Sequence, residues 1–85
     1  MDALVLLTAG EIMEMPRDDF FKKFVSDIAR SEAFGQIFTL GVDNVSDEDK
    51  GQVLGDLRRN GYAVENDEVL DEVIIAVCRR AVSLR

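Results

Sequence analysis

The sequence predicts an all-α protein, a small bundle of four to five short helices with a short extended segment near residues 62–64. Apolar residues recur at spacings of three and four, which places them on one face of an α-helix. Capping residues and charged residues stand where the two ends of a helix need them. Eighty-five residues supply surface for one hydrophobic core, so residues 1–85 are expected to form a single helical domain.

The apolar run at residues 3–7 fits either a strand or the beginning of a helix that reaches Met15. The helix is preferred, because Thr8 and Glu11 have the spacing of a capping box within it. Gly10 weakens the continuity of such a helix, since glycine is a poor helix former.

The next helix is expected to begin at Pro16, because proline is favoured at the first helical position and two aspartates then lie in the first turn. It is expected to run to Ser31 or Phe34. A second short helix, residues 33–40, repeats the apolar spacing and ends at Gly41. The apolar face of the helix that begins at Pro16 consists of Phe20, Phe21, Phe24, Val25 and Ile28.

Ser46 is the expected N-cap of a further helix, which has three acidic residues in its first turn. This helix is expected to end at Asn60 and Gly61, after two arginines in its last turn. If Gly61 takes the left-handed conformation, Leu57 and Tyr62 are the pair that packs together in a Schellman motif.

Asn66 is the expected N-cap of the last helix, which carries acids in its first turn and Arg79 and Arg80 in its last turns. The β-branched residues 73–75 also suit a buried strand, but the stretch after Asn66 has no glycine or proline and is too long for an ordinary strand. A helix is therefore predicted. The core is expected to contain Phe20, Phe24, Ile28, Leu54, Leu57, Val73, Ile74 and Val77.

Composition argues against catalysis. The chain has no histidine, one cysteine and no motif that names a reaction. Residues 43–49 are acidic but lack the ligand spacing and central glycine of a calcium-binding loop. We therefore expect a non-enzymatic protein with no metal and no cofactor. The formal charge of −7 disfavours nucleic acid as a direct ligand, because the phosphate backbone would repel the protein.

The sequence also bears on the compartment. No positively charged segment precedes an apolar run as it does in a secretory signal. The longest apolar run, residues 73–78, has six residues where a membrane span needs about twenty. The single cysteine, Cys78, fits a reducing compartment and a role as a small buried apolar residue. A cytoplasmic protein is expected, with no membrane partner.

Acidic residues are concentrated in the middle of the chain. Residues 43–72 hold ten acids and three bases, so this window alone carries a charge of −7. Helix dipoles explain the acids in first turns but not the whole excess. We therefore expect a face that binds a basic surface of another protein, formed by Asp43, Asp47, Asp49, Asp56, Glu65, Asp67, Glu68, Asp71 and Glu72. Small acidic phage inhibitors of defence or transcription proteins are similar in size and charge, so the favoured interpretation is a viral inhibitor that occupies a nucleic-acid-binding surface.

The last helix suggests an alternative. Its main apolar face serves the core, yet Ile75 and Val82 lie seven residues apart on another side. Both positions are candidate contacts of a homodimer, in which the protein would be a structural or regulatory module acting through apolar helix contacts.

A second alternative is a carrier or leader-type domain. The string at residues 39–43, with the chain's length and acidity, is similar in outline to acyl carrier proteins. Residues 20–27 with the later Gly61-Tyr62 are similar to leader domains of peptide precursors. The chain lacks the Asp-Ser-Leu attachment sequence of the first and the double glycine of the second.

Overall fold

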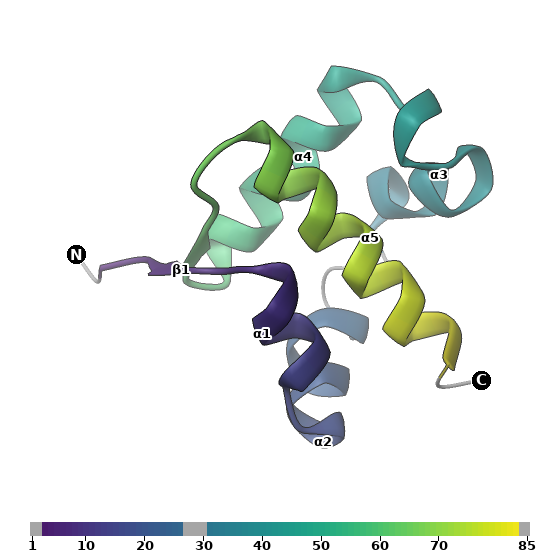
Figure 1. The fold of residues 1–85 in the computed structure, drawn as a ribbon. Helices are drawn as coiled ribbons and strands as arrows, with labels where there is room; N and C mark the ends of the chain where they lie inside the picture. Colours follow the sequence, from purple (N-terminus) through teal and green to yellow (C-terminus); the bar gives the residue numbers. More distant parts are fainter. Residues whose placement is uncertain (1–2, 27–30, 84–85) are drawn as a thin grey trace.

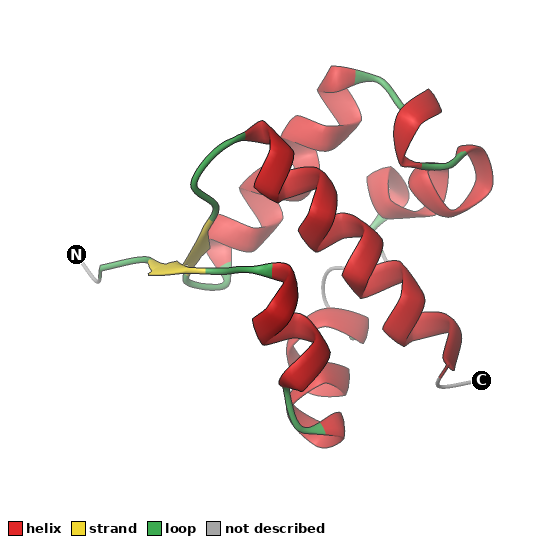
Figure 2. Ribbon diagram, viewed as in Figure 1, coloured by secondary structure: helices red, strands yellow, loops and turns green. Residues whose placement is uncertain are grey.

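The computed structural model describes residues 3–26 and 31–83. The all-α prediction is confirmed: five α-helices and two very short strands make up most of the described chain (Figure 2). The longest helix, α5 (Asp67–Ser83), crosses the molecule, and α1 (Ala9–Glu14) packs beside it (Figure 1). The two strands lie together at the end of the molecule from which the N-terminus projects (Figure 1).

The preference for helix at residues 3–7 is wrong. Val5–Leu6 forms strand β1, which pairs in parallel with strand β2, Tyr62–Ala63. The Val5 amide donates a hydrogen bond to the Gly61 carbonyl over 2.9 Å. Helix α1 begins only at Ala9, where the Thr8 hydroxyl accepts a hydrogen bond from the Glu11 amide. Thr8 is thus the N-cap of α1, and the extended chain before it is stabilised by a partner more than fifty residues away.

Helix α2, Arg17–Phe20, begins one residue after the predicted start at Pro16, which is its N-cap, and the helix then widens. Residues Phe21–Val25 form a π-helical turn, in which the Ser26 amide donates to the Phe21 carbonyl. Phe20 and Phe24 both stay buried, with ring centres 5.6 Å apart. Phe21 is 53% exposed, so its expected place on the apolar face is wrong, because the π-helical turn changes the number of residues per turn from this residue on.

Residues 27–30 of the expected helix, Ile28 among them, lie outside the described residues. Ser31 is the N-cap of the next helix, α3 (Glu32–Leu40), so the first helix does not reach Phe34. The predicted end of α3 at Gly41 is confirmed, because this glycine has a φ of 86°. A short 3₁₀ helix, Val42–Asn44, leads on to the next element.

Helix α4, Asp47–Arg59, has the predicted limits. The Ser46 hydroxyl caps it by accepting from the Asp49 amide. Gly61 has a φ of 89° and its amide donates to the Arg58 carbonyl over 3.0 Å, as in a Schellman ending. The chain turns there into β2, which confirms the predicted extended segment, and the Asn66 side chain then caps α5 by accepting from the Val69 amide.

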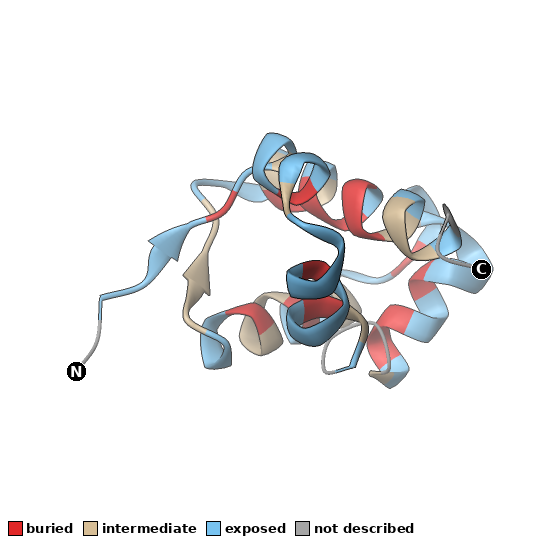
Figure 3. Ribbon diagram, turned by 90° about the horizontal axis from the view of Figure 1, so that it is seen from below, coloured by how far each residue is buried: buried red, intermediate tan, exposed pale blue. Residues whose placement is uncertain are grey.

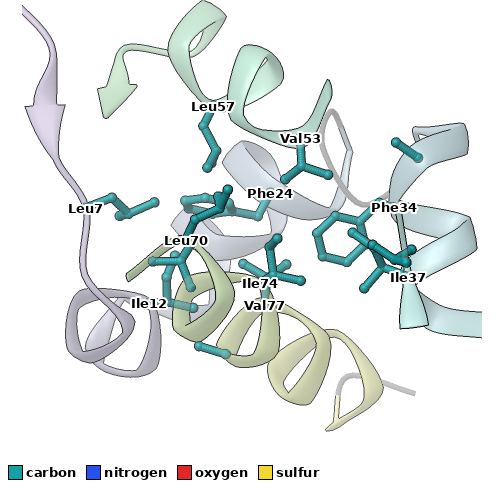
Figure 4. Packing of buried hydrophobic residues seen from close by; sticks show 14 of the residues in the cluster. Leu7, Ile12, Phe24, Phe34, Ile37, Val53, Leu57, Leu70, Ile74 and Val77 are labelled. Atoms are coloured by element: carbon teal, nitrogen blue, oxygen red, sulfur yellow. The ribbon is translucent and has the colours of Figure 1, made fainter. Parts of the chain in front are cut away.

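The core lies between α5 and the other helices, and buried positions face inward (Figure 3). No polar side chain is buried there among the residues that the structure describes. Leu7, Ile12 and Phe34 approach the α5 residues from separate elements (Figure 4). Six predicted core residues are buried, and Leu54 packs against them: the six are Phe20, Phe24, Leu57, Val73, Ile74 and Val77.

Candidate interaction surfaces

The first turns of α4 and α5 face each other across a cleft of about 330 Å³. Helix spacing explains which residues line it, because positions three and four apart share one face of a helix. We call this feature the acidic cleft. Its lining consists of Asp47, Lys50, Gly51 and Leu54 from α4 and Asp67, Leu70 and Asp71 from α5.

An ion pair joins the two walls of the acidic cleft. The Lys50 ammonium lies 3.2 Å from a carboxylate oxygen of Asp71, and both side chains are partly shielded from water. Asp47 and Asp67 stand at the first positions of their helices, and no ion pair engages either of them in the described part of the chain. The three carboxylates and one ammonium leave the lining with a net charge of −2.

The structure distributes the other predicted acids differently. Asp56 is half-buried and forms an ion pair with Arg59 one turn later on α4. Glu72 lines a separate hollow beside α1. Asp49 is half-buried, and the remaining three are exposed and do not line the acidic cleft: Asp43, Glu65 and Glu68. Of the nine acids predicted to share one face, three therefore meet in the acidic cleft.

Lys50 was not among the predicted site residues. Lys50 follows Asp47 by three residues, so both lie on the same face of α4. Its partner Asp71 belongs to another helix. The residue spacing within α4 can indicate which residues share a face of that helix. It cannot identify the ion pair, because that pair depends on how α4 and α5 cross.

A second, apolar surface lies where α5 meets α3. Ile75 and Val82, the predicted oligomer contacts, are 36% and 53% exposed. Both line a groove of about 430 Å³, together with Ile37, Phe38, Gly41, Cys78 and Arg79. We call it the apolar groove. The part of the apolar groove that α3 forms was not predicted. Phe38 belongs to the expected apolar pattern of residues 33–40, yet it remains 37% exposed.

Cys78 forms part of the wall of the apolar groove and is half-buried. Burial raises the pKa of its thiol from 9.0 to about 11, because a thiolate would lose hydration there. The thiol is therefore neutral near pH 7, which is typical of a packing residue rather than a nucleophile.

The described residues contain no group of three or more acidic or cysteine side chains placed to hold a metal ion. Among the helices that the structure describes, none combines the length and the apolar character that crossing a membrane requires. Comparison with protein-family models, with curated proteins and with solved structures finds no match for the chain.

Proposed function

We propose that this protein is a non-enzymatic binding module whose acidic cleft docks on a basic surface of another protein. The observation that carries the proposal is the meeting of Asp47, Asp67 and Asp71 at one place, although they come from two helices. Asp47 and Asp67 keep carboxylates that no described basic side chain neutralises, so both are available to lysine or arginine side chains of a partner.

The negative charge of the acidic cleft indicates that the partner surface is basic. Surfaces that hold nucleic acid carry clustered lysines and arginines that contact phosphates. Carboxylates grouped in one cleft, on a chain of net charge −7, complement such a cluster. The protein would then act as an inhibitor, since the partner surface it covers is no longer open to nucleic acid. This is the mode of action expected of a phage-type inhibitor.

The test begins with affinity capture from the native host, followed by binding measurements with the purified partner. The double variant Asp47→Asn, Asp67→Asn should weaken binding at least tenfold. Raising the salt concentration from about 50 mM to about 500 mM should also weaken binding of the wild type, because screening acts on exposed charges. This protein and nucleic acid should compete for binding to the partner.

A matched control is available on α2. Asp18 and Asp19 are also exposed acids in a first helical turn, but they do not line the acidic cleft. Replacing both by asparagine makes the same change in net charge and should leave affinity nearly unchanged. Equal losses in the two double variants, or binding that is indifferent to salt, would rule out the acidic cleft as the docking site.

A further inference from the structure

The outward side of α5 carries a row of exposed residues that the core does not use. We call Glu72, Ile75, Arg79 and Val82 the outer row, and all four are exposed. Their spacing of three and four keeps them within roughly 80° of arc around the helix. The residues that line the acidic cleft from α5 lie on a different part of its circumference, so the outer row is a separate surface.

The outer row stands between two hollows. On one side is the apolar groove, to which α3 contributes Phe38. On the other is a hollow of about 240 Å³, to which α1 contributes Ala9 and Met13. Ile75 and Arg79 line both, so they form a ridge between them. Met13, like Val82, is 53% exposed, which extends the apolar surface on both sides of the ridge.

The charges of the outer row are opposite in sign and lie on the two sides of Ile75 along the helix. Glu72 precedes it by three residues and Arg79 follows it by four. The two charged residues are two turns apart, about 10 Å along the helix. No ion pair engages either one within the described residues. If two such helices lie antiparallel across a twofold axis beside Ile75, Glu72 of each faces Arg79 of the other.

We propose that the outer row is the docking surface for a second copy of this chain, with the two α5 helices antiparallel. A twofold contact uses the same patch twice, so it requires a patch that is complementary to itself. The outer row meets this requirement, with an acid three residues before its apolar centre and a base four residues after it. The ridge of each copy enters a hollow beside the ridge of the other.

The charge along α5 as a whole favours the same orientation. Its first turn carries Asp67 and Glu68. A parallel pair would set these acids beside the same acids of the other copy, whereas an antiparallel pair places them at opposite ends of the contact. The acidic cleft is lined by other residues of α5, so this proposal does not depend on the proposed function.

Charge reversal tests the pairing directly, with mass measured by light scattering and by analytical ultracentrifugation. The wild type should have twice the mass of one chain. Arg79→Glu and Glu72→Arg should each be monomeric, because each places like charges opposite one another. An equimolar mixture of the two variants should again give the dimer mass, since both cross-pairs are then complementary.

Two further variants separate dimerisation from folding. Ile75→Asp should be monomeric with an unchanged helical circular-dichroism spectrum. Arg58→Glu, an exposed residue at the end of α4, makes the same charge change as Arg79→Glu and should remain dimeric. A wild type that is monomeric at protein concentrations up to about 0.5 mM would overturn the proposal, because the dissociation constant of any dimer would then lie above the millimolar range. Failure of the mixed variants to form a dimer would overturn the antiparallel pairing.

Discussion

The guanidinium of Arg80 lies over the ring of Phe20, 4.6 Å from its centre. The same side chain donates hydrogen bonds to the carbonyls of Ile12 and Met15, over 2.7 and 2.6 Å. These carbonyls belong to the end of α1, where the last turn of a helix leaves acceptors without intrahelical donors. The Arg80 side chain, near the end of α5, therefore contacts both α1 and α2 and stabilises their packing against the longest helix.

Replacement of Arg80 by alanine should lower the free energy of unfolding by about 2–3 kcal/mol, because two charge-assisted hydrogen bonds and the ring contact are lost together. Arg80→Lys should recover part of this, since an ammonium keeps the charge but not the planar fork. Urea denaturation measures both changes. Arg58→Ala, at an exposed position, is the control and should change stability by less than about 0.5 kcal/mol. Equal effects of Arg80→Ala and Arg58→Ala would show that the contacts of Arg80 contribute nothing to stability.

Replacing Gly61 and Gly51 by alanine should change the free energy of unfolding in opposite directions. Gly61 has a φ of 89°, which an L side chain adopts only with strain, so Gly61→Ala should cost about 1–2 kcal/mol. Gly51 lies inside α4, and a Cβ built there meets nothing within 4 Å. Gly51→Ala should therefore stabilise the protein by about 0.5–1 kcal/mol. Thermal unfolding of both variants checks the pair, and a gain in melting temperature for Gly61→Ala would contradict the assigned helix ending.

The elements that the sequence predicted well are those whose signals lie within a few residues. Ser46 and Asn66 cap the helices that follow them through side-chain contacts three residues away. Gly41 and Gly61 end helices by their own backbone conformation. Local chemistry of this kind can be recognised in a sequence, so four of the helix ends were correctly predicted.

Residues 3–7 and Phe21 were mispredicted for reasons that are not local. Val5 becomes extended because Tyr62 offers it a parallel partner, and no pattern within the first fifteen residues shows this. The π-helical turn after Phe20 changes the number of residues per turn, so a pattern read at constant helical spacing could not show where Phe21 would point. The acidic cleft is limited in the same way, because its residues meet only where two helices cross.

The ion pair between Lys50 and Asp71 should contribute little to stability, about 0.5–1 kcal/mol in a double-mutant cycle, because both side chains remain partly exposed. Its larger effect is on the charge of the acidic cleft. Lys50→Gln removes the ammonium and frees the carboxylate of Asp71. If the proposed function holds, this variant should bind the basic partner more tightly than the wild type. Weaker binding would mean that Lys50 itself contacts the partner, which calorimetric titration can decide.

Cys78 should make stability fall at alkaline pH. Its thiol has a pKa of about 11 in the folded protein, against 9.0 for an unperturbed thiol, because burial disfavours the thiolate. Below pH 9 both folded and unfolded forms keep the proton, and this group then has no effect on the pH dependence. Between pH 9 and about 11 the unfolded chain releases the proton first, so stability declines as pH rises. Comparison of wild type with Cys78→Ala in urea at several pH values isolates this contribution from tyrosine and lysine titration. Parallel pH curves for the two proteins would mean that the thiol is as well hydrated in the folded protein as in the unfolded chain.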